Sequence, residues 1–201
     1  MWYDTAMNIF VLDIDPAKAA QCLCDTHLIR MVQETTELLC TVHRLMDHND
    51  QGKHPNSTLE ELLLPASEVD HPCVLWAMES IHNYHWVYGH GIALLMEYSY
   101  RFNKDHIHHD LYRALYEIPH GFFYSKDTFE RTPFIQCMPE KYKVAEEYKI
   151  TGDAILAYRL FYIGEVIPTA TWTSRKPPQW YVDGIENVLG NRHVEIEDKL
   201  S

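Results

Sequence analysis

Three ionisable residues with helical spacing, His27, Arg30 and Glu34, could do acid–base chemistry. His27 and Glu34 are seven positions apart, so two helical turns bring them to nearly the same angle, about 10 Å apart along the axis. Apolar and small residues follow the spacing of a core-facing helix, at Leu28, Met31, Val32, Thr35, Leu38, Leu39, Val42, Leu45 and Met46. A carboxylate beside such a face is partly desolvated, and a neighbouring cation would tune its pKa. We therefore predict Glu34 as a catalytic acid/base supported by His27 and Arg30. Ordinary ion pairing on a solvated helix edge is the alternative.

A second group of residues has the composition of a nucleic-acid contact. Arg175 and Lys176 alternate with aromatic rings on a proline-rich segment, the mixture that phosphate contact and base stacking require. The candidate DNA-binding residues are Arg159, Trp172, Arg175, Lys176, Trp180 and Tyr181. An equally supported interpretation is that the two tryptophans anchor the segment to the core while the cations are solvated.

The spacing of possible metal ligands along the sequence gives only a weak indication of a metal site. The pairs Glu79-x-x-His82 and Glu117-x-x-His120 resemble half of a di-metal carboxylate bundle, but Pro119 falls inside the second pair and is expected to break its helix. We therefore expect no metal and no cofactor. The five cysteines form no Cys-x-x-Cys pair, which predicts reduced thiols and a cytoplasmic protein.

Charge and hydropathy exclude some classes of protein. Seventeen basic and 29 acidic residues leave a formal charge of −12, which argues against a broadly basic nucleic-acid binder but permits a local basic groove. An acidic surface could also bind a protein partner. We find no apolar run long enough to span a membrane and no signal peptide, and we expect no membrane association.

Hydrophobic periodicity predicts a mostly α protein, a single-domain helical bundle with long loops and a short extended N-terminal segment. The expected helices cover residues 15–47, 70–102, 105–118 and 153–163, with an extended segment at 9–12, a loop at 47–65, a weak point at Gly89 and Gly91, and irregular chain at 119–152 and 164–181. The domain spans residues 1–184, of which 1–6 could be extra residues before a second methionine. Residues 185–201 are predicted to be a polar tail.

Two short motifs resemble the small helical pyrimidine-dimer DNA glycosylases of the endonuclease V type. The first is Asp25-Thr26-His27-Leu28 followed by Glu34, and the second is Pro178-Gln179-Trp180-Tyr181. Residues 7–13, Met-Asn-Ile-Phe-Val-Leu-Asp, are similar to the opening of a group of uncharacterised bacteriophage proteins. The resemblance implies that Glu34 is an acid/base at the sugar C1′ and that Trp180 and Tyr181 help to hold the duplex.

The chain departs from that family at the nucleophile and around the glutamate. The family attacks with an α-amine exposed by removal of the initiator methionine. Here the bulky Trp2 or Asn8 follows a methionine, so we expect no imine through the terminus. The family also carries arginines where this chain has Gln33 and Glu37.

Together these features predict a glycosylase-like DNA base-processing enzyme of bacteriophage type, a hydrolase of DNA repair or modification, located in the host cytoplasm. One alternative is a glycosylase-like transferase that hypermodifies a thymine derivative in phage DNA. Another is a non-enzymatic protein that binds a host partner through its acidic surface.

Overall fold

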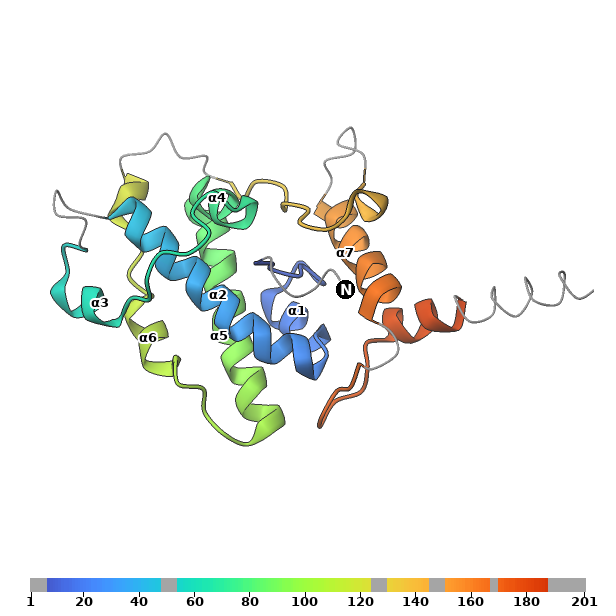
Figure 1. Cartoon of the computed structure of the whole chain (residues 1–201). Coiled ribbons are helices and arrows are strands. Elements are labelled where there is room, and N and C mark those ends of the chain that lie inside the picture. The colour runs from blue at the N-terminus through green and yellow to red at the C-terminus, as the bar shows by residue number, and fades with distance from the viewer. Residues whose placement is uncertain (1–6, 48–53, 124–129, 145–150, 167–169, 188–201) are drawn as a thin grey trace, which may run out of the picture.

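The computed structural model describes residues 7–47, 54–123, 130–144, 151–166 and 170–187, which form a mostly α-helical body with no strand among them (Figure 1). The predicted fold class is confirmed. None of these helices combines the length and apolar character needed to cross a membrane. The elements are α1 (Pro16–Cys22), α2 (Asp25–Met46), α3 (Ser57–Leu62), α4 (Pro72–Met78), α5 (Ile81–Phe102), α6 (His109–Ala114), the 3₁₀ helices η1 (His120–Phe123) and η2 (Glu140–Tyr142), α7 (Thr151–Val166) and a helix over residues 179–187.

The two long helices α2 and α5 form the centre of the fold, and α1 and α4 pack against them (Figure 1). The predicted apolar face of α2 is confirmed over most of its length. Leu45 and Met46 at its C-terminal end are half-buried against the core, and its first seven members are fully buried: Leu28, Met31, Val32, Thr35, Leu38, Leu39 and Val42. Burying a large aliphatic side chain contributes about 1.5–3 kcal/mol to folding. This face therefore fixes the rotation of α2, and with it the direction in which His27, Arg30 and Glu34 project.

The prediction of one helix over residues 15–47 is wrong at one point, because the helix is interrupted between α1 and α2. Leu23 is extended, and the amide of Cys24 donates to the Tyr162 hydroxyl at 2.7 Å. The amide of Asp25 donates to the Thr171 carbonyl at 2.8 Å. Tertiary partners thus take the N–H groups that a continuous helix would use, and α2 begins at the first residue of the Asp-x-His-Leu motif.

The boundaries of the other helices also differ from the predicted ones. The predicted loop 47–65 contains α3, which Asn56 caps by accepting from two amides, and the predicted helix 70–102 is divided into α4 and α5 at Ser80. The predicted helix 105–118 shortens to α6, whereas α7 extends the predicted 153–163 at both ends. No break occurs at the two glycines of α5. Residues 179–187 are helical rather than loop and tail, and the rest of the predicted tail lies outside the described residues.

The predicted extended segment 9–12 is a buried turn. Asn8 Oδ1 accepts from the amides of Ile9 and Phe10, and Phe10 has a φ of 35°. The Phe10 ring stacks on Phe161 of α7 with centroids 5.9 Å apart. This turn joins α7 to the α2 side of the molecule (Figure 1).

Candidate functional site

Glu34 is largely buried on α2, with 12% of its side chain exposed. Oε1 accepts from the Arg30 guanidinium one turn earlier, and Oε2 accepts from the Asn8 amide at 3.0 Å. Burial raises the pKa of Glu34 above its ordinary value, because lost solvation outweighs the Arg30 and Asn8 contacts that favour the charged form. A carboxyl whose pKa is raised holds a proton more readily, which suits it to proton transfer.

His27, two helical turns before Glu34 on α2, packs against two aromatic rings. Its ring centroid is 4.9 Å from that of Phe10 and 5.2 Å from that of Tyr162, the latter edge-on. Burial, helped by the charge of Arg30, lowers the pKa of His27 to about 4. His27 is therefore neutral near pH 7, and it can orient a substrate or accept a proton but does not serve as a standing cation.

A pocket of about 600 Å³ opens beside these residues. Its volume falls within the range of small-molecule sites. Three cations, Arg30, Lys141 and Lys143, line it with one carboxylate, Glu165, although the whole chain carries a net charge of −12. The pocket thus combines three cations, each paired with a carboxylate, with apolar rings. Its walls also include Asn8, Phe10, His27, His71, Cys137 and Phe161.

Glu34 itself stands behind the pocket wall, since two of its contacts, Arg30 and Asn8, line the pocket. Lys141 donates to Glu165 at 2.5 Å, and Lys143 donates to Glu140 at the same distance. The sequence singled out Arg30 but missed both lysines, which lie more than a hundred positions further along and reach the pocket only through the fold.

Arg175, one of the two predicted cations of the C-terminal segment, is bound by the protein itself. Arg175 Nη2 donates to Glu97 at 2.7 Å and its Nε bonds the same carboxylate. Glu97 also accepts from Arg101 at 2.6 Å, and Arg101 reaches Asp25 at 3.1 Å. Asp25–Arg101–Glu97–Arg175 is therefore a continuous charge network that ties this segment to α2 and α5.

The aromatic members of the segment divide between core and edge. Trp172 is buried and its indole donates to the Cys22 carbonyl at 3.1 Å, and Tyr181 is buried against it with ring centroids 4.8 Å apart. Trp180 is half-buried beneath Arg159, which also donates to the Leu12 carbonyl at 2.9 Å. Of the two tryptophans in the anchoring interpretation, Trp172 is buried as that interpretation expects and Trp180 is half-buried.

Lys176 is exposed. Its contact with DNA stays a prediction, as do those of the other segment residues.

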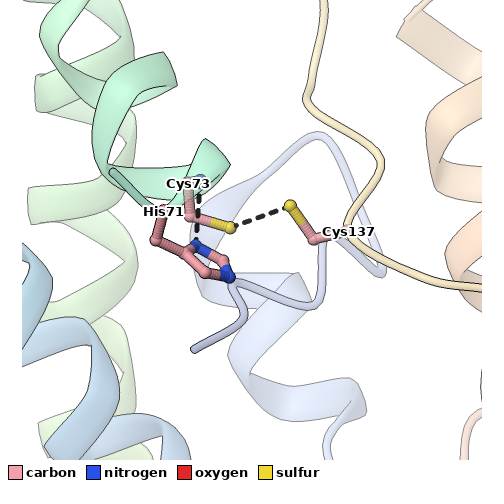
Figure 2. Close-up of side chains that lie close together, drawn as sticks. All are labelled: His71, Cys73 and Cys137. Carbon is pink, nitrogen blue, oxygen red and sulfur yellow. Dashed lines mark hydrogen bonds between the residues drawn. The ribbon is translucent and has the colours of Figure 1, made fainter. Parts of the chain in front are cut away.

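Two groups of possible metal ligands appear among the described residues, neither of them the pairs singled out from sequence. One is His71, Cys73 and Cys137, shown in Figure 2. Glu79 and His82 are exposed, and Glu117 and His120 form an exposed pair 3.8 Å apart.

The second group, His43, Asp47 and His54, is buried. The Asn56 amide donates to His54 Nδ1 at 3.1 Å, so the ring proton lies on Nε2 and is donated to Asp47 Oδ2 at 3.2 Å. Asp47 also accepts from the Gly121 amide at 3.0 Å. The arrangement ties the end of α2 to the α3 cap and to η1.

The chain was compared with protein-family models, curated proteins and solved structures, and none matches it.

Proposed function

We propose that this protein is an enzyme that processes a nucleobase in DNA, with Glu34 as the general acid/base at the base or its sugar C1′. The observation that carries the proposal is the buried Glu34 carboxyl, of raised pKa, behind a pocket of about 600 Å³ whose lining includes three cations. The stacked rings of Phe10 and Phe161 offer an apolar wall for a base. His27 and Arg30 are the supporting residues.

Arg30 links substrate binding to the carboxyl in this proposal. In the free protein its guanidinium bonds Glu34 and also lines the pocket. A substrate phosphate competes with Glu34 for this cation, and its binding would release the carboxyl to exchange a proton. The nitrogen that bonds Glu34 is the backbone amide of Asn8 and not a free amine. The proposed chemistry therefore proceeds without an imine at that atom.

The second candidate function is group transfer to a thymine derivative, in which a nucleophile displaces an anionic leaving group. The cations Arg30, Lys141 and Lys143 around one pocket favour it, because they would stabilise a departing phosphate or diphosphate. Glu34 would then take the proton from the incoming nucleophile. Both candidates use the same site, and they differ in whether the glycosidic bond breaks.

The first test is a DNA-binding assay. Fluorescence anisotropy measures binding to duplex and single-stranded oligonucleotides across a salt series. Only a few phosphates can meet the pocket cations, so the log–log salt slope should be shallow, near 0.9 per phosphate neutralised. Lys143→Ala should reduce the slope by roughly one, whereas Lys18→Ala, a change on α1 away from the pocket, should leave it unaltered.

Mass spectrometry of the DNA then distinguishes the reactions. The oligonucleotides carry thymine, a thymine dimer, or a 5-hydroxymethyl pyrimidine esterified with phosphate or diphosphate. A free base supports glycosidic cleavage, and loss of the ester with gain of a nucleophile supports transfer. If no DNA is bound at low salt, the proposal is wrong and the acidic partner-binding alternative takes its place.

A further inference from the structure

Two cysteines far apart in sequence meet at the edge of the pocket. Sγ of Cys73, at the start of α4, lies 3.2 Å from Sγ of Cys137, which precedes η2 (Figure 2). Cys73 is fully buried and Cys137 is half-buried and lines the pocket. The two sulfurs are closer than ordinary packing contacts, and the Cys73 thiol donates to Cys137.

His71 completes a set of three ligand atoms with these sulfurs. One ligand atom from each residue lies within 4.8 Å of the other two. Two thiolates and one imidazole form a donor set that selects Zn²⁺ over hard cations. We propose that His71, Cys73 and Cys137 bind a zinc ion whose fourth coordination position opens into the pocket beside His27 and Arg30.

Zinc binding would require little movement of the two sulfur atoms. With Zn–S bonds of about 2.3 Å in a tetrahedral site, two sulfurs stand about 3.8 Å apart. The thiols at 3.2 Å would therefore separate by roughly half an ångström. His71 Nδ1 accepts from the Cys73 amide at 3.1 Å, so an ion that took this lone pair would replace one capping hydrogen bond of α4.

The backbone around Cys137 is fixed by two hydrogen bonds. Cys137 is held on both sides of its backbone, since its carbonyl accepts from Asn8 Nδ2 at 2.8 Å and its amide donates to the Tyr158 hydroxyl at 3.2 Å. Because His71 and Cys137 line the pocket, an ion has a route to the site.

The buried group of His43, Asp47 and His54 is the competing metal site. Its Asp47 and His54 ligand atoms are used in hydrogen bonds within the protein, as is His71 Nδ1 in the thiol site, and the His54 tautomer places a proton on the nitrogen that faces Asp47. Both groups line pockets, but the two thiols make the first group the softer donor set, which zinc prefers. This inference does not depend on the proposed function, because metal binding can be measured without DNA.

The experiment uses the full chain, reduced and freed of metal, titrated with Zn²⁺ and separately with Co²⁺. We expect one zinc per chain by elemental analysis, a zinc-dependent rise in melting temperature, and a thiolate-to-cobalt charge-transfer band. Cys137→Ser and His71→Gln, both at the pocket edge, should each weaken zinc binding at least tenfold, and Cys137→Ser should diminish the cobalt band. The matched controls Cys22→Ser and His54→Gln should bind as the parent does.

Three results would overturn the proposal. The first is a reduced parent protein that gives neither stoichiometric zinc nor a cobalt–thiolate band. The second is loss of binding in His54→Gln with retention in Cys137→Ser, which would place the ion in the other group. The third is a parent whose two thiols close to a disulfide with a mild oxidant while the reduced form binds no zinc, which would define a redox pair. Far-ultraviolet circular dichroism of each variant confirms that it is folded.

Discussion

Replacing Glu97 by Gln should test the charge network that secures the C-terminal segment. Glu97 is 4% exposed on α5, and its carboxylate pairs with both Arg101 and Arg175. The Arg101 side chain is fully buried and also donates to the carbonyls of Leu23 and Gln21. Glutamine keeps the size of the side chain but removes the charge, which leaves Arg101 paired with Asp25 alone and Arg175 without its carboxylate partner in the network.

Loss of one partner from a buried ion pair costs about 3–5 kcal/mol, because the remaining charge stays desolvated. For a domain of this size, 1 kcal/mol lowers the melting temperature by roughly 2–4 °C. Glu97→Gln should therefore melt roughly 6–20 °C below the parent, and urea unfolding should report the same loss of free energy. Asp110→Asn is the control, because Asp110 is 83% exposed with Arg113 3.7 Å away and such pairs contribute at most about 1 kcal/mol.

A Glu97→Gln variant that unfolds within about 1 kcal/mol of the parent would refute this account. Arg175 would then be free to act as the phosphate contact expected from sequence. In that case Arg175→Ala should weaken DNA binding without loss of stability, whereas the network predicts the opposite pattern.

Two further predictions concern buried residues of α2 and α5. Burial lowers the pKa of His43 and His90 to about 4, so as pH falls below 6.5 the unfolded chain binds protons first, and stability that is complete above pH 6.5 is progressively lost. Each histidine should cost about 2 kcal/mol at pH 5, and urea midpoints that are equal at pH 7.5 and pH 5 would contradict this. Gly91→Ala places a Cβ 2.3 Å from the buried Tyr112 hydroxyl and should destabilise by about 1–3 kcal/mol, whereas Gly89→Ala meets its nearest atom at 3.6 Å and should be neutral or stabilising. Thermal melts of the two alanine variants check the pair, and equal melting temperatures would show that α5 and α6 do not pack as described.

The parts of this structure that periodicity encodes were predictable, and the parts that depend on long-range contacts were not. The face of α2, and the proximity of Arg30 and Glu34 on it, follow from helical spacing alone. The break after α1 depends on the Tyr162 hydroxyl, which no local pattern reveals.

The candidate site shows the same division. Helical spacing identified His27, Arg30 and Glu34. The other side of the pocket is formed by residues 136–143, whose sequence has no periodic pattern that would predict this position. The pairing of Cys73 with Cys137 spans 64 positions and has no local motif. For Arg175 the composition of the segment suggested nucleic acid, yet its partner is a buried glutamate on another helix, which composition cannot identify.

The most direct test of the central claim is the single-turnover rate of Glu34→Gln on the DNA substrate that the parent converts, measured beside Glu37→Gln. Glu37 lies one turn further along α2 and bonds Gln33 at 2.6 Å, so it controls for removal of a carboxylate from this helix. General acid/base catalysis contributes about 10²–10⁴-fold. We expect Glu34→Gln to lose a factor in that range while it melts at or above the parent temperature, because the charge it removes is desolvated, and we expect Glu37→Gln to keep its rate. A Glu34→Gln protein that retains the parent rate, or that loses activity only in proportion to its folded fraction, would contradict the assignment of Glu34 as the acid/base.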